Sequence, residues 1–322
     1  MQRKVNQIGP STLMVSLPSK WAKKYNIKKG DSLEIEELEK NLLLHQPESK
    51  VREGLKVSLD LHELNVSLIW YQLTAAYRSG ADEMHLNFSE EAVRDDKLDK
   101  NREIHELLQT ITDRCIGMEV IRNTPSTYII REISSIKQDE FAIIFRRIFF
   151  SLQVMFDNII EGIEKKNKKI IHHVAYYADI QINKFSDYCM RILTKTNDPA
   201  TMLTSVIFRL EEIGDSLKHL ADHLLKKEIN EEILDFIRNG KAFLATMEKF
   251  YFTGVKQDLL AMEKQKILLM KKEELLQKKA DVVTCFLLKN MIRQILSVVE
   301  AKLTMLFSQA ATTKSSSARQ ES

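Results

Sequence analysis

The pattern of apolar and polar residues divides the chain into three regions. Residues 1–47 alternate in short runs that predict strands around one short helix. Residues 51–137 mix strand-like alternation with helical periodicity, and from residue 138 onward apolar residues recur three and four positions apart. The sequence therefore predicts a multidomain, mainly α protein. It has a small β-rich N-terminal domain, a small α/β middle domain at 51–137, and a helical bundle at 138–310.

The C-terminal region is predicted to consist of six long helices, because Pro199 is the only proline after residue 126. Their expected spans are 139–166, 168–194, 199–227, 231–252, 255–278 and 281–310. Two three-helix repeats, at about 138–227 and 231–310, describe them most simply. The polar tail at 311–322 is expected to be disordered.

Leucines at heptad spacing mark the core-facing side of the helix at 199–227. Leu203, Leu210, Leu217 and Leu224 repeat every seven residues and predict a bundle seam. A similar apolar stripe runs along the helix at 168–194. These residues are expected to pack, and the Met and Phe residues on the same stripes are expected to pack with them.

Composition narrows the function classes without choosing one. The 322 residues carry a net charge of +3, so any electrostatic signal must be local. Cys115, Cys189 and Cys285 lie far apart, which argues against a disulfide framework or a zinc-thiolate site and fits a reducing cytosol. Arg146 and Arg147 interrupt the apolar stretch at 141–156. We expect a cytoplasmic protein without membrane insertion.

The strongest local charge lies at the N-terminus, where residues 1–29 contain seven cations and no acid. The run RKVNQIGPSTLMVSLPSKWAKKYNIKKGDSLEIEE resembles the AbrB/SpoVT swapped-hairpin DNA-binding family. The resemblance implies a homodimer with interleaved hairpins that presents basic side chains to DNA. The residues that match the basic strand and the basic helix of the family are Arg3, Lys4, Lys20, Lys23 and Lys24. The alternative is a lysine helix that merely faces water.

About 47 residues form a marginal core, so this domain should either pack on the rest of the chain or dimerise, and the sequence favours dimerisation even apart from the resemblance.

Two pairs of polar residues stand at i and i+4 on neighbouring helices: Asp179 with Asn183, and Glu211 with Asp215. All four lie off the heptad seam and would form a shallow patch of oxygen ligands, with Gly214 permitting close approach. The alternative is an ordinary solvated acidic face.

The segments RLEEIGDSLKHLADHL and ADIQINKFSDY resemble motifs of the PhoU phosphate-signalling family. The resemblance implies that Asp179, Asn183, Glu211 and Asp215 bind metal. Oxygen ligands favour Mg, Ca or Mn, whereas iron or zinc would require His219 or His223 to join. The second repeat has Ile295 and Val299 at the equivalent spacing and is expected to be structural.

The sequence favours a regulator over an enzyme. No E-x-x-H pair lies near the acids, and no P-loop, nucleophile elbow or HExxH is present. A short antitoxin is disfavoured by the long patterned region that follows residue 47. The domain order resembles archaeal phosphate-uptake regulators and implies a DNA-binding regulator of phosphate homeostasis. The alternative is a PhoU-like adaptor of a phosphate transporter or kinase that uses its N-terminal domain only to dimerise.

Overall fold

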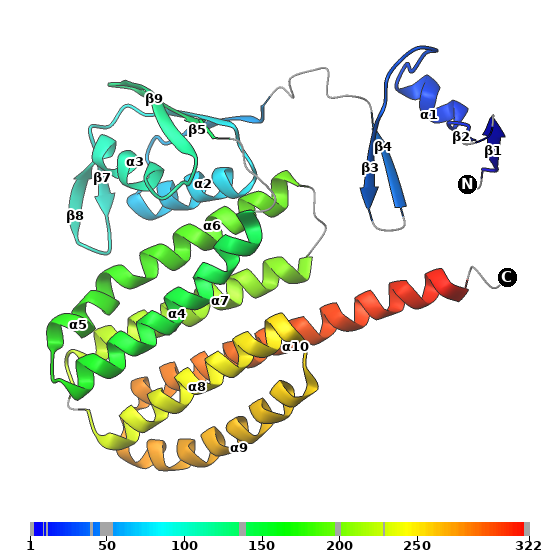
Figure 1. Cartoon of the computed structure of the whole chain (residues 1–322). Helices are drawn as coiled ribbons and strands as arrows, with labels where there is room; N and C mark the ends of the chain where they lie inside the picture. The colour runs from blue at the N-terminus through cyan, green and yellow to red at the C-terminus, as the bar shows by residue number, and fades with distance from the viewer. Residues whose placement is uncertain are drawn as a thin grey trace. The chain divides into compact units, whose positions relative to one another are not determined.

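The computed structural model describes residues 3–8, 10, 12–38, 41–45, 54–134, 140–196, 201–227 and 229–318. The chain divides into two compact units, Met1–Gly54 and Leu55–Ser322 (Figure 1). Short strands make up most of the first unit, and helices dominate the second. The multidomain, mainly α architecture expected from the sequence is confirmed.

The first unit consists of two antiparallel hairpins and one short helix. Its elements are β1 (Val5–Ile8), β2 (Thr12–Val15), α1 (Ser19–Lys24), β3 (Glu34–Leu38) and β4 (Asn41–His45). β1 pairs with β2, and β3 pairs with β4. None of the side chains whose burial is described in residues 3–44 is buried. Within one chain, the described part of this unit therefore has no closed core.

The second unit begins with an α/β region around a four-stranded sheet. Its elements are β5 (Lys56–Asp60), α2 (Val66–Arg78), β6 (Glu83–Asn87), β7 (Ala92–Asp95), β8 (Lys100–Glu103), α3 (Ile104–Thr112), β9 (Met118–Thr124) and β10 (Thr127–Glu132). The strand order is β5-β6-β10-β9. β5 and β6 are parallel, with α2 as the crossover between them, and the remaining pairs are antiparallel.

The sequence pattern missed the β7–β8 hairpin. The alternation at 51–137 did not single out these strands, but residues 100–103 form β8 and pair with β7. The helix starts one residue later because the Glu103 side chain accepts hydrogen bonds from the backbone N–H groups of His105 and Glu106, at 3.1 and 2.6 Å. This capping satisfies donors that have no partner within the helix.

Long helices form the rest of the second unit. They are α4 (Glu140–Glu164), α5 (Lys168–His173), the π-helical turn η1 (Val174–Ala178), α6 (Asp179–Lys195), α7 (Thr201–Leu224), α8 (Glu231–Thr253), α9 (Lys256–Lys279) and α10 (Val282–Ala318). The single helix expected at 168–194 is thus α5, η1 and α6 in succession. The helices α4 to α7 cover the first expected repeat and α8 to α10 cover the second, and the relation of these two sets as repeats stays a prediction.

The end of α10 differs from the expected disordered tail. The helix continues to Ala318, across most of segment 311–322, and residues 319–322 lie outside the described residues. Ala310 and Ala311 favour helix, and no Gly or Pro follows to break it.

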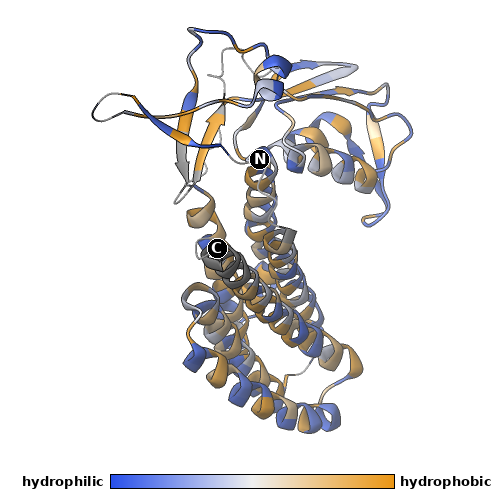
Figure 2. Cartoon of the chain, turned by 90° about the vertical axis from the view of Figure 1, so that its right-hand side faces the viewer, coloured by the Kyte–Doolittle hydropathy of each residue, from blue (hydrophilic) through white to orange (hydrophobic). Residues whose placement is uncertain are grey.

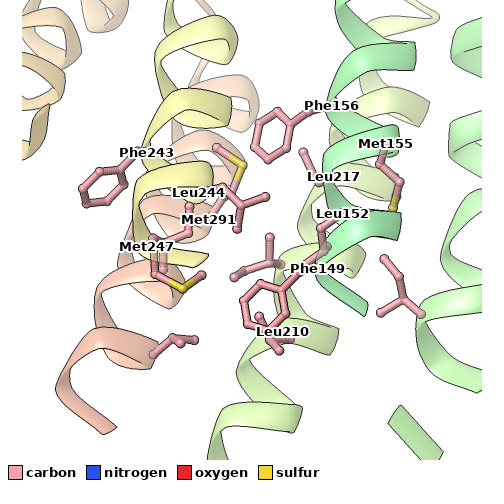
Figure 3. Close-up of a cluster of buried hydrophobic side chains, with 14 of the residues drawn as sticks. Phe149, Leu152, Met155, Phe156, Leu210, Leu217, Phe243, Leu244, Met247 and Met291 are labelled. Atoms are coloured by element: carbon pink, nitrogen blue, oxygen red, sulfur yellow. The ribbon is translucent and has the colours of Figure 1, made fainter. Parts of the chain in front are cut away.

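The bundle core follows the heptad seam. Leu210 and Leu217 of α7 meet Phe149, Leu152 and Phe156 of α4, and residues of α8 and α10 close the cluster (Figure 3). All five of these side chains are buried. A second core lies in the α/β region and includes Leu73, Met84 and Tyr128.

One described segment, Val282–Ser308 of α10, is long and apolar enough to span a membrane by length and composition alone. The stretch at 141–156 considered from the sequence is instead interrupted by two arginines. Leu288, Met291 and Ile295 of this segment are buried in the bundle core. Orange and blue residues alternate along the long helices of the bundle in Figure 2, and 39% of the apolar window is buried, so packing in the bundle accounts for part of this apolar character. The absence of membrane insertion stays a prediction.

Candidate functional sites in the N-terminal unit and at the α2–α6–α7 cleft

The lysines of α1 share one exposed face. Lys20, Lys23 and Lys24 stand at i, i+3 and i+4 and are exposed, whereas Trp21 and Ala22 on the other side are half-buried. Arg3 and Lys4 are also exposed, directly before β1. The structure therefore groups the three helical lysines as expected and leaves all five cations accessible.

The four residues predicted to bind metal line one cleft in the second unit. This cleft of about 540 Å³ lies between α2 on one side and α6 and α7 on the other. Its polar lining consists of Ser67, Thr74, Arg78, Lys97, Arg114, Asp179, Asn183, Asp187, Glu211, Asp215 and Lys218. The two helices do bring their polar residues together. These residues face the α/β region across the cleft. The side chains of Asp179 and Glu211 are largely withdrawn from solvent, whereas that of Asp215 is 46% exposed, so the solvated-face alternative describes only part of the row.

Arg78, the last residue of α2, occupies the centre of the carboxylate group. Its Nε donates to Asp187 Oδ1 at 2.6 Å, and its Nη2 donates to Glu211 Oε2 at 3.2 Å. Arg114 approaches the other oxygen of Asp187 at 3.5 Å and stacks 4.7 Å from the ring centre of Trp70. For Asp187 and Glu211, the α/β region thus supplies the cations and the bundle supplies the acids.

Burial dominates the electrostatics of these acids. It raises the pKa values of Asp187 and Glu211, and the neighbouring Arg78 opposes the rise. A buried carboxylate without its cation is costly, so Arg78 holds two acids that would otherwise favour the protonated form.

Lys218 joins one acid from each predicted pair. Its Nζ donates to Asp179 Oδ2 at 2.7 Å and to Asp215 Oδ1 at 3.2 Å. Partial burial disfavours the charge of Lys218, but these contacts outweigh it and raise the lysine's pKa. Asn183 donates its amide to the same Asp179 oxygen at 3.4 Å.

This arrangement does not match a metal site. Three of the four predicted ligands already accept hydrogen bonds from Arg78 or Lys218, and the fourth, Asn183, acts as a donor. Among the residues that the structure describes, no group of three or more His, Cys, Asp and Glu side chains could hold a metal. His223 pairs instead with Asp281 at 2.8 Å, and His219 is exposed. The geometry favours a network of ion pairs.

Gly214 permits close approach, but of a helix and not of a ligand. A Cβ at this position would lie 2.9 Å from Ile182 Cδ1. The glycine therefore lets α6 pack tightly on α7, which brings the two polar rows together.

Sequence reasoning missed Asp187 and Arg191, which continue the ladder of Asp179 and Asn183 at intervals of four. Arg191 is fully buried, donates to the Tyr77 carbonyl at 2.8 Å, and pairs with Glu132 at 3.2 Å. Polar residues that recur on one side of an apolar helix were the available signal. Their partners could not be found, because Arg78 and Glu132 lie far away in the sequence.

Comparison with known proteins places one part of the chain. Residues 7–53 match the family model described as antidote-toxin recognition MazE, bacterial antitoxin. The chain therefore carries a MazE/AbrB-type domain at its N-terminus. No curated protein and no solved structure matches the chain. Most of the chain, including the cleft, lies outside the matched segment.

Proposed function

We propose that the protein is a dimeric DNA-binding transcription regulator. The observation that carries the proposal is the N-terminal unit itself: its described side chains include none that is buried, yet it exposes apolar strands and a lysine face. Val5, Leu13 and Ile35 are each more than 60% exposed in the single chain. A second copy that covers these apolar side chains would leave the cations facing outward.

DNA is the partner that the cations favour. Lysine and arginine neutralise backbone phosphates and release counterions, which supplies most of the sequence-independent affinity for DNA. The match of residues 7–53 to the MazE/AbrB type supports the same proposal.

We place the regulated process in phosphate uptake, with the bundle as a sensing or partner-binding module. The support is the resemblance of two bundle segments to PhoU motifs. Both segments line the cleft between α2, α6 and α7, which we call the ionic cleft because ion pairs fill its polar side. No step of this proposal requires an enzymatic activity or a bound metal.

The test is fluorescence anisotropy of the full chain on duplexes from upstream of its own gene and of phosphate-transport genes. Replacing Arg3, Lys4, Lys20, Lys23 and Lys24 by Ala should lower the affinity and flatten the salt dependence, whose slope reflects roughly 6–10 phosphate contacts in a dimer. A matched control removes five lysines of α9, namely Lys264, Lys266, Lys271, Lys272 and Lys278. It causes the same change in net charge and should leave binding intact.

Two rivals make different predictions. If both variants bind as well as the parent, the N-terminal unit is only a dimerisation device, and the adaptor of a phosphate transporter or kinase becomes the better proposal. An antitoxin would instead form a stoichiometric complex with a toxin protein. The matched family's name refers to toxin recognition, so co-purification with the product of a neighbouring gene would favour that rival.

A further inference from the structure

The outer face of α4 exposes apolar side chains that the bundle does not cover. Ile143 is 60% exposed, Phe150 is 69% exposed and Val154 is 37% exposed. They lie at i, i+7 and i+11, on one side of the helix. Figure 3 shows Phe149, Leu152, Met155 and Phe156 of α4 directed into the core, so the exposed row lies on the opposite side.

Two opposite charges share this row. Arg147 is exposed between Ile143 and Phe150, and Asp157 follows Val154 with its side chain 55% exposed. Arg147 has a ring contact with Phe185 at 5.9 Å and no ion-pair partner among the described residues. Asp157 contacts Lys241 through one oxygen and keeps its other oxygen available.

This row is complementary to itself in an antiparallel arrangement. If two copies of α4 cross near residue 152, Phe150 of each chain faces Val154 of the other. Arg147 of each chain then faces Asp157 of the other. A two-fold axis requires such reciprocal contacts, since residue i meets residue j and residue j meets residue i.

The charges also select the register. Sliding one helix by a heptad would bring Val154 against Ile143, but it would then place Asp157 opposite Glu140 of the second copy. Like charges in facing positions are destabilising. The first register also brings Glu140 opposite Glu164, at the two ends of the helix pair, but it forms two Arg–Asp pairs that the shifted register lacks.

We propose that α4 forms a second dimer contact with α4 of another copy of this chain, centred on Phe150 and Val154. One helix pair buries less surface than the 1,200 Å² or so of a standard stable interface, so it is weak alone. Dimerisation through the N-terminal unit, on which this inference rests, would make the contact intramolecular and raise the local concentration to about the millimolar range.

The contact is tested in the full chain by cross-linking with a short bismaleimide. Cys115 and Cys189 are buried, so Cys285→Ser leaves a background without an exposed thiol. In that background, Val154→Cys should cross-link between chains. Leu260→Cys on α9 is the matched control, because Leu260 is 54% exposed but lies outside the proposed contact. It should not cross-link.

Two further changes test the proposed pairs. Phe150→Glu should lower cross-linking at position 154 by about tenfold, whereas Leu275→Glu on α9, where Leu275 is 57% exposed, should have no effect. Arg147→Glu should also lower the yield, and adding Asp157→Lys should restore it because the charges are then exchanged across the two-fold axis. Failure of this restoration would overturn the register.

Light scattering on the same samples keeps the two levels of proposal apart. A dimer that cross-links at position 154 no better than at position 260 overturns the α4 contact and leaves the regulator standing. A monomer at micromolar concentration overturns the dimerising role of the N-terminal unit and, with it, this inference.

Discussion

The two predicted three-helix repeats share one core and differ in what their outward residues meet. In the first repeat, Glu211 and Asp215 of α7 face α2 across the ionic cleft. At the corresponding spacing in the second repeat, Ile295 and Val299 of α10 are buried in the core. At the same spacing, one helix therefore presents acids to another element, and the other helix presents apolar residues to the bundle core.

The neighbours of the middle helices explain this difference. α6 packs against α2 and adds Tyr188 and Ile192 to the core of the α/β region (Figure 1). α9 contributes Met262, Leu269 and Leu276 to the bundle core, but its outer residues Leu260 and Met270 are more than half exposed. Amphipathicity fixes the inward face of a helix, whereas the role of the outward face depends on which other element packs there.

Among the variants that test this difference between the repeats, Arg78→Ala is expected to have the largest effect on stability. It leaves Asp187 and Glu211 partly desolvated without their main cation, and should lower the free energy of unfolding by about 3 kcal/mol in urea denaturation. Arg238→Ala in the second repeat is the control, because its pairs with Glu164 and Glu231 are solvent-exposed and their loss should change stability little. Equal effects of the two changes would contradict a structural role for the cleft.

The same variant should respond to pH in a defined direction. Burial raises the pKa values of Asp187 and Glu211 above 3.8 and 4.5, so their ionisation reduces stability as the pH rises through that range and beyond. Arg78→Ala removes the opposing charge and should enlarge this loss. Its deficit relative to the parent should therefore shrink as the pH falls from 7 to 5.

A smaller effect is expected at the start of α10. Asp281 accepts hydrogen bonds from the backbone N–H groups of Val283 and Thr284, at 3.1 and 3.3 Å, and so caps the helix. Asp281→Ala should cost about 1–2 kcal/mol, measured by urea unfolding at pH 7.

Partial burial of Asp281 disfavours its charge, but hydrogen bonds from Thr284 and His223 outweigh burial and lower its pKa to about 2. Its contribution is therefore fully present above pH 3.8 and is lost as the pH falls toward 2. A difference between parent and variant that stays constant from pH 4 down to pH 2.5 would argue against this assignment.

Two glycines sharpen the comparison of the repeats. Gly214→Ala should destabilise by about 1 kcal/mol, because its Cβ would meet Ile182, a stiff β-branched side chain, at 2.9 Å. Gly240→Ala in α8 would meet the flexible end of Met291 at 3.0 Å. It should be neutral or stabilising by up to about 1 kcal/mol from helix propensity. Thermal unfolding of both variants measures the difference, and a reversed order would show that α6 and α7 are not tightly packed at Gly214.

The smallest change is expected in the metal content of the protein. Because Arg78 and Lys218 occupy the acids, elemental analysis after purification without chelator should find no stoichiometric metal. Glu211→Ala combined with Asp215→Ala should not change the metal content. A bound metal that this double variant loses would restore the metal-site hypothesis and require Arg78 and Lys218 to move aside.

The sequence alone determined the helices and the inward faces. Heptad leucines such as Leu210 and Leu217 predicted the core, because local periodicity defines which side of a helix is apolar. The spacing of Glu211 and Asp215 also predicted, correctly, that these acids lie off the seam and share a face with each other.

Only the tertiary structure decided what these acids do. Arg78 lies 109 positions before Asp187 and 133 before Glu211, and no periodic pattern links residues across such distances. The fold of the α/β region brings the end of α2 against α6 and α7, where the guanidinium replaces water as the partner of the carboxylates. Whether an acidic face binds solvent, a metal or an arginine depends on which element covers it, and that is a property of packing between distant segments.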